Sequence, residues 1–139
     1  MSVATADRSR IDLSSKTAVL AAGDLAAILL FVSVGEYTHG YNPLVDVGRV
    51  AGTFVPFLVG WLVVATAAGL YASDAPGTLA NSTLVTLLSW VGAVAIAQAL
   101  RATSVFHGNA ALTFAVVSIG VGGVLLCLWR VGATLFVGN

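Results

Sequence analysis

The charged residues are spaced so that long apolar stretches separate them. No Asp, Glu, Lys or Arg occurs in residues 50–73, 75–100 or 102–129, and residues 17–35 are interrupted by Asp24 alone. Each stretch is close to or above the ~20 residues that a helix needs to cross the hydrocarbon core of a bilayer. The pattern therefore predicts four transmembrane helices.

The predicted helices follow a flexible cytoplasmic tail over residues 1–15 and cover residues 16–35, 50–71, 79–100 and 110–131. Ser14 and Ser15 have side chains suited to cap the start of the first helix. The predicted fold is an all-α polytopic membrane protein of one domain, in which two helical hairpins form a four-helix bundle.

The composition is that of a chain that uses lipid as its solvent. Of its 139 residues, 58% are hydrophobic and 9% are charged, whereas a soluble domain carries about 25% charged residues. The net charge of zero offers no basic surface to a nucleic acid. Cys127 is the single cysteine, so the chain can form neither an intrachain disulfide nor a cysteine metal cluster. We expect the bilayer as a partner and no cofactor.

The basic residues beside the helices predict an orientation. One side of the four-helix arrangement carries Arg8, Arg10, Lys16 and Arg130, and the other carries Arg49 and Arg101. Short cytoplasmic flanks carry the excess of Lys and Arg. We therefore expect a multi-pass protein of the cell membrane with both termini in the cytoplasm, and residues 36–40 facing outward.

Small residues recur along one face of three predicted helices. The faces are Gly52, Pro56, Gly60, Val63 and Ala67; Ser82, Thr86, Ser89, Ala93 and Ala97; and Ala111, Ala115, Ser118 and Gly122. Small residues let helices approach closely in lipid. A bundle of this size has little room for an internal path, so we expect a homo-oligomer or a membrane-complex partner. The faces of the second and fourth helices are the candidate interfaces.

Asp24 and Arg130 form the first pair of candidate functional residues. Asp24 lies about two turns into the first helix, on the same face as Ile28 and Phe31. Arg130 ends the fourth predicted helix on the same side of the membrane. A carboxylate at this depth is costly unless it is protonated or paired. Two interpretations stay open, a proton- or ion-coupling group and a structural ion pair.

The second candidate group combines the two connections on the outer face. Its members are Glu36, His39, Arg101 and His107. Glu36 and His39 are three residues apart, which puts them on one helical face if the helix continues. Such a group can bind a small anion or a metal ion, relay protons, or hold a haem between two histidines. It can equally be a polar network that caps helix ends.

Several short motifs resemble those of a known membrane family. The motifs are Asp24, Gly35 followed by His39-Gly40, Thr-Phe-Val-Pro-Phe-Leu-Val-Gly-Trp at residues 53–61, Arg101, and Trp129-Arg130. The family is catalogued as domain of unknown function three-thousand-and-fifty-four. The resemblance implies four transmembrane helices and supplies no activity. Members often carry a basic residue after the helix-end glycine, where this chain has Glu36.

No catalytic motif accompanies the candidate residues. The sequence contains no HExxH, no phosphate-binding loop and no Ser-His-Asp set in a recognisable context, so we do not expect an enzyme. The favoured function is a small oligomeric transporter or channel for a solute or ion, with Asp24 and Glu36 carrying charge. The alternatives are a non-catalytic accessory or assembly subunit of a larger, respiratory-type membrane complex, and a histidine-based metal or haem redox protein.

Overall fold

The structure is a computed structural model that describes residues 11–72, 78–106 and 111–136. Four helices follow one another in the chain: α2 (Ser15–Thr38), α3 (Val47–Ala67), α4 (Leu79–Arg101) and α5 (Leu112–Phe136). All four are long and apolar enough to cross a membrane. The expected all-α fold with four transmembrane helices is therefore confirmed.

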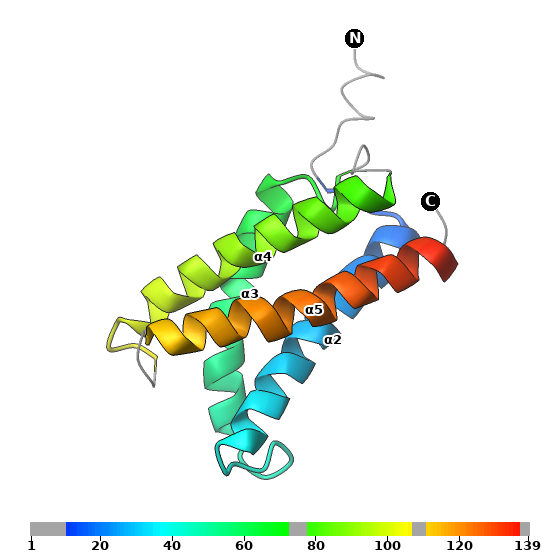
Figure 1. The fold of residues 1–139 in the computed structure, drawn as a ribbon. Coiled ribbons are helices and arrows are strands. Elements are labelled where there is room, and N and C mark those ends of the chain that lie inside the picture. Colours follow the sequence, from blue (N-terminus) through cyan, green and yellow to red (C-terminus); the bar gives the residue numbers. More distant parts are fainter. Residues whose placement is uncertain (1–10, 73–77, 107–110, 137–139) are drawn as a thin grey trace.

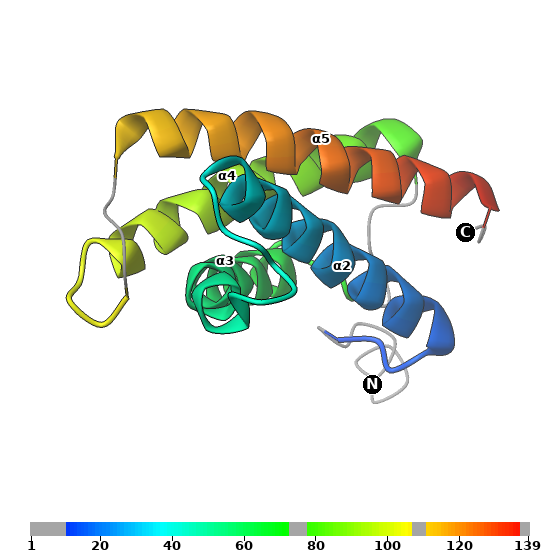
Figure 2. The same ribbon diagram turned by 90° about the horizontal axis from the view of Figure 1, so that it is seen from below.

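The helices form a closed ring around one core. Each helix packs against its neighbours in the chain, and α5 returns to pack against α2. Figure 2 looks nearly along α3 while α4 and α5 lie across the view, so α3 crosses these two helices steeply. In Figure 1 the start of α2 lies near the end of α5, and the α2–α3 connection lies at the opposite end of the molecule.

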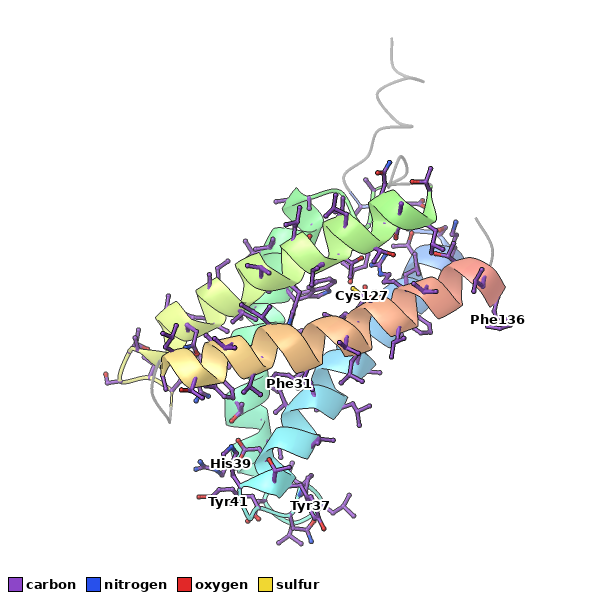
Figure 3. All side chains as sticks on the ribbon, in the orientation of Figure 1. Phe31, Tyr37, His39, Tyr41, Cys127 and Phe136 are labelled. Atoms are coloured by element: carbon purple, nitrogen blue, oxygen red, sulfur yellow. The ribbon has the colours of Figure 1, made fainter. Side chains whose placement is uncertain are left out.

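Aromatic side chains from all four helices fill the centre of the ring. The ring centroids of Phe31, Phe57 and Trp90 lie 5.4 to 5.9 Å apart. Phe114 lies 5.9 Å from Phe57, and Trp61 lies 6.3 Å from Trp90. Edge-to-face and offset-stacked pairs such as these are the favoured geometries of aromatic rings. We call these five residues the aromatic core; Figure 3 labels Phe31 at the centre of the bundle.

Two glycines bring the helices close to this core. A Cβ at Gly60 of α3 would lie 2.4 Å from the backbone oxygen of Ala93 in α4, and a Cβ at Gly122 of α5 would lie 2.4 Å from the Trp90 side chain. Both glycines belong to the faces that we expected to serve as interfaces between copies. The structure instead uses them within one chain.

The predicted small-residue faces are fully buried only in α4. There the five predicted positions are buried: Ser82, Thr86, Ser89, Ala93 and Ala97. In α3, Pro56 and Gly60 are buried, whereas Val63 and Ala67 are exposed. The bulky side chains of Phe57 and Trp61 face the core, so Val63 and Ala67 lie on the opposite, outer side of the helix. Ser118 and Gly122 of α5 are buried, whereas Ala111, just before α5, is exposed.

Two helices continue past charged residues that we expected to end them. Helix α2 includes Glu36 and runs to Thr38, and α5 includes Arg130 and runs to Phe136. Both side chains are buried and, as described below, both have partners of opposite charge. A charge neutralised inside the bundle does not mark the end of a transmembrane helix.

Helix α3 ends four residues before the predicted Tyr71 because the chain reverses at a glycine. Gly69 adopts a left-handed φ of 83°, and the N–H of Leu70 donates to the carbonyl of Ala65 at 3.0 Å. This glycine-terminated helix end is a Schellman motif. Beyond it the chain turns back on the bundle, and Tyr71 is buried with 5% of its surface exposed.

Residues at the end of the expected tail pack against this reversal. The N–H of Asp12 donates to the carbonyl of Tyr71 at 2.6 Å. Ser14 caps α2 as predicted, because its hydroxyl accepts from the N–H of Thr17 at 3.3 Å. The rest of the predicted tail, residues 1–10, lies outside the described residues.

Candidate functional site

The Asp24 carboxylate lies in a hydrogen-bonded network inside the bundle. Arg130 donates to it twice, from Nε to Oδ1 at 2.9 Å and from Nη2 to Oδ2 at 2.6 Å. The Tyr71 hydroxyl also donates to Oδ2, and Nε1 of Trp61 donates to the Tyr71 hydroxyl oxygen at 2.8 Å. We call Asp24, Arg130, Tyr71 and Trp61 the Asp24 cluster.

The Asp24 cluster joins the first helix to the last and is sealed from solvent. Asp24 is 0% exposed and Arg130 is 4% exposed. The neighbouring residues pack equally closely, because a Cβ at Gly23 would overlap the ring of Trp129. Nε1 of Trp129 donates to the carbonyl of Leu20 at 3.3 Å. The structure thus brings together the two residues that the sequence suggested as a pair.

Tyr71 is held as a neutral phenol just beyond the end of α3. Burial raises the pKa of Tyr71 well above its usual value near 10, and the neighbouring Asp24 carboxylate raises that pKa further. A neutral phenol can donate to Asp24 while it accepts from Trp61. The two hydrogen bonds therefore point in one direction, toward the carboxylate.

A second polar cluster lies at the opposite end of α2. Oε2 of Glu36 accepts from Nε of Arg49 at 2.9 Å, and Oε1 accepts from the Thr53 hydroxyl at 2.9 Å. The guanidinium carbon of Arg49 lies 4.0 Å from the centroid of the Tyr41 ring, which is a cation–π contact. The connection after α2 and the start of α3 therefore meet on the Glu36 carboxylate.

Arg101, at the end of α4, completes this second cluster. Its guanidinium carbon lies 4.4 Å from the centroid of the Phe114 ring, and its charge interacts with those of Glu36 and Arg49. Arg101 is 9% exposed. We call Glu36, Arg49, Thr53 and Arg101 the Glu36 cluster. Arg101 and Glu36 thus lie near enough for their charges to interact, and a common binding role for them stays a prediction.

His39 and Glu36 lie in different surroundings. His39 is the C-cap of α2, and its imidazole is exposed, whereas Glu36 is buried. Figure 3 shows His39 with Tyr37 and Tyr41 at the outer tip of the α2–α3 connection. The helix ends at Thr38, one residue before His39, so the condition for a shared helical face is not met.

His107 lies outside the described residues. Within residues 11–72, 78–106 and 111–136, no group of three or more His, Cys, Asp or Glu side chains could hold a metal ion. The two-histidine metal or haem site therefore stays a prediction.

Sequence reasoning missed several members of the two clusters. Trp61 was noted only as the last residue of the motif at residues 53–61, yet it is fully buried and donates to Tyr71. Tyr71 was assigned only to a helix end. The signal that could have found it is the preceding Gly69, which can reverse the chain after an apolar helix. Arg49 and Thr53 follow Glu36 across a turn, where spacing does not predict contacts.

Polar side chains also line the buried face of α4 between the two clusters. Thr86 and Ser89 are 0% and 2% exposed. Neither hydroxyl oxygen has a hydrogen-bond partner within the described residues. Buried hydroxyls without partners are uncommon in folded proteins, and they leave polar positions open inside the bundle.

The fold and the two buried charged clusters define a multi-pass, all-α membrane protein. A family model described as "Protein of unknown function (DUF3054)" matches residues 21–133, a range that includes every member of both clusters. The chain belongs to this family, as its motifs suggested. No curated protein and no solved structure matches the chain.

Proposed function

We propose that the protein is a small oligomeric transporter or channel for an ion or solute, in which Asp24 is the coupling group. The observation that carries the proposal is the fully buried salt bridge between Asp24 and Arg130. Desolvation offsets much of the attraction within a buried ion pair, so such a pair contributes little net stability. Acids within membrane spans mark ion and proton paths. These properties favour a functional role for the ion pair, in which it opens and closes, over a purely structural role.

Protonation of Asp24, or binding of a cation there, removes the partner of Arg130. An uncompensated guanidinium in the bundle costs several kcal/mol. The contact between α2 and α5 then becomes unfavourable, and Tyr71 loses the charged acceptor of its hydrogen bond. The ring of four helices would then have two arrangements, one with the Asp24–Arg130 ion pair formed and one with it broken. Transport requires such an alternation between two conformations.

The filled centre of the ring leaves two places for a path, between copies of the chain or within one chain whose ring opens. The aromatic core fills the centre of the ring, so a path runs between copies or opens where α2 meets α5. The unpartnered hydroxyls of Thr86 and Ser89 offer polar positions along an opened ring. The proposal assigns the protein no catalytic activity and no cofactor.

The proposed orientation keeps both termini in the cytoplasm of a cell-membrane protein. Lys16, with Arg8 and Arg10, supplies the positive flank. Arg130 no longer counts toward this flank, because it points into the bundle, and Arg101 is equally buried on the other side. The remaining charges still favour the same orientation.

Flux through reconstituted vesicles tests the role of Asp24. Purified protein is placed in liposomes, and proton or ion movement is followed with an enclosed dye while candidate solutes are varied. Asp24→Asn keeps the shape of the side chain but removes the charge that Arg130 needs. We expect flux to fall at least about tenfold, the factor that ~1.4 kcal/mol in a barrier represents.

Asp46→Asn is the matched control, because Asp46 is half-exposed at the start of α3 and pairs with no cation in the described chain. Flux of this variant should equal that of the wild type. Equal flux in Asp24→Asn and the wild type, or wild-type flux no higher than in empty vesicles, contradicts the proposal.

A non-catalytic accessory or assembly subunit of a larger membrane complex is the second candidate. It is favoured by the filled aromatic core together with large apolar side chains on the outer faces, such as Leu30, Leu88 and Leu128. Purification in mild detergent with mass determination separates the two candidates. Stable recovery with a large partner, and no flux alone, supports the subunit. An absorbance scan and metal analysis of the same sample test the redox hypothesis.

A further inference from the structure

We propose that the Glu36 cluster binds an oxyanion, a phosphate or carboxylate group, at the guanidinium of Arg101, with Arg49 as a second contact. The inference goes beyond transport. It concerns the end of the bundle opposite the Asp24 cluster, and it is measured as binding in the absence of any flux.

The charges of the cluster do not balance. Arg49 and Arg101 each carry a positive charge, and Glu36 carries the one negative charge that acts on both. Both Glu36 oxygens are already engaged, one by Arg49 and the other by Thr53. One positive charge is left over in a region where 91% of the Arg101 surface is covered.

One buried donor of Arg101, its Nε, lacks an acceptor within the described residues. A buried donor attached to a charged group and left unpaired is among the costlier defects in a folded protein. The face of its guanidinium is covered by Phe114, so its N–H groups point outward from the edge. An acceptor that satisfies them must arrive in the plane of the guanidinium.

An oxyanion fits this geometry better than any cation or neutral ligand. The planar fork of a guanidinium matches two oxygens of a phosphate or carboxylate. Arg49 uses Nε for Glu36, which leaves its terminal nitrogens for a second contact. A cation is disfavoured by the positive excess. A neutral acceptor leaves the extra charge uncompensated.

The position of the cluster offers access from the membrane surface. Arg49 is 38% exposed at its side chain and stacks on Tyr41. Tyr41 also lines a shallow surface hollow with Tyr37, Thr38, Gly40 and Asn42. Two sources can supply an oxyanion at this depth, a lipid headgroup phosphate and a free anion from solution.

Thermal unfolding of the full-length protein in a neutral detergent tests the site. Inorganic phosphate replaces chloride at constant ionic strength, because a ligand of the folded state raises Tm in a saturable way. In a second arm, native mass spectrometry follows phosphatidylglycerol through delipidation. A retained lipid that phosphate displaces identifies the headgroup as the source. A phosphate-dependent Tm with no retained lipid identifies a free anion.

Variants connect the effect to Arg101. Arg101→Gln removes the charge and the fork, and we expect the affinity for phosphate or phosphatidylglycerol to fall about tenfold or more, as for loss of hydrogen bonds to charged groups. Arg101→Lys keeps the charge without the planar fork, and its affinity should lie between those of the wild type and Arg101→Gln. Lys16→Gln removes one exposed positive charge at the other end of α2 and should bind as the wild type does.

A purely structural Arg101, which interacts only with the end of the α4 dipole, gives different results. Neither phosphate nor phosphatidylglycerol then binds the wild type in a saturable way, or Arg101→Gln binds both as well as the wild type. Either result overturns the proposal. If Arg101→Gln does not fold, the wild-type titration and Arg101→Lys still test the proposal. An affinity of Arg101→Lys equal to that of the wild type also contradicts recognition by the guanidinium fork.

Discussion

Tyr71 shows how one side chain outside the helices can organise a buried charge. Its hydroxyl accepts from Trp61 and donates to Asp24, and Arg130 holds the other side of the same carboxylate. The phenol therefore sets the position of Asp24 from a turn and not from a helix. Removal of the hydroxyl leaves Trp61 and Asp24 each one partner short.

Tyr71→Phe should lower the free energy of unfolding by about 1–3 kcal/mol, the usual cost of a buried polar group left without its partner. The raised pKa of Tyr71 adds a dependence on pH. In the unfolded chain the phenol loses its proton near pH 10, whereas the folded protein retains it. The stabilisation from Tyr71 is therefore complete below about pH 10 and is lost as pH rises further.

Thermal unfolding of wild type and Tyr71→Phe across neutral to strongly alkaline pH checks this prediction. The stability difference between the two proteins should be constant up to about pH 10 and should shrink above it. Tyr37→Phe, at a tyrosine with 70% of its surface exposed, is the control and should follow the wild type. A difference that is independent of pH contradicts the assigned role of burial and Asp24.

At the scale of single residues, the sequence could predict which charges need compensation. It could not predict the partners that turns and connections bring to them. Asp24 and Arg130 were identifiable because each interrupts an apolar stretch and needs compensation there. Arg49 could be placed at the same face as Glu36, but its contact depends on the shape of a connection. Tyr71 depends on the backbone of Gly69, which neither hydropathy nor periodicity encodes.

At the scale of the helices, two ends are built in the same way. Gly40 after α2 and Gly69 after α3 both adopt left-handed φ values, 93° and 83°. In each case the N–H of the next residue reaches the carbonyl five residues back, from Tyr41 to Glu36 and from Leu70 to Ala65. Each reversal delivers a tyrosine to a charged cluster. The glycine-terminated helix ends therefore position one tyrosine at each charged cluster.

The existence of the four helices could be predicted from the length of the apolar stretches, one of which contains Asp24. Helix α4 was placed within one residue of its observed end. The other ends were less accurate for a physical reason. Glu36 and Arg130 were expected to stop their helices because a charge normally leaves the membrane interior. Salt bridges to Arg49 and Asp24 instead keep both charges inside the bundle, and such partners are known only once the helices are packed.

The contact between α3 and α4 gives a prediction at the same scale. Gly60→Ala places a methyl group 2.4 Å from a backbone oxygen of α4, which can be relieved only if the helices move apart. We expect a loss of stability of about 1–3 kcal/mol, as for other overpacked cores. Thermal unfolding in detergent measures it.

Gly120→Ala is the matched control, because a Cβ there meets nothing within 4 Å and the site is exposed. Replacement of a mid-helix glycine by alanine should leave the protein as stable or make it slightly more stable. Equal stability of the two variants would show that α3 and α4 do not pack through Gly60.

At the scale of the whole molecule, the two charged clusters lie at opposite ends of the ring with the aromatic core between them. Trp61 belongs to both the aromatic core and the Asp24 cluster, and Phe114 of the core contacts Arg101 of the Glu36 cluster. The aromatic core therefore lies between the two clusters, and one of its rings connects it to each cluster. A change of side-chain packing in the core is a physical route by which one cluster can affect the other.

Labelling of single cysteines in intact cells tests the overall topology. In a Cys127→Ser background, Leu44→Cys and Leu13→Cys introduce thiols at positions with 89% and 94% exposure in the isolated chain. We expect a membrane-impermeant maleimide to modify position 44 from outside and to reach position 13 only after lysis. The reverse pattern contradicts the proposed orientation, and labelling of both positions from outside contradicts a crossing by α2.

The bond between the first helix and the last has a consequence for how the protein is made. Asp24 and Arg130 are 106 positions apart in the chain, so α2 enters the membrane long before its partner has been synthesised. Until α5 arrives, the carboxylate must stay protonated or be held by the insertion machinery, because lipid offers it no counterion. The ion pair is therefore complete only when α5 is in place. A prematurely terminated chain carries an unpaired acid by which quality control can recognise it.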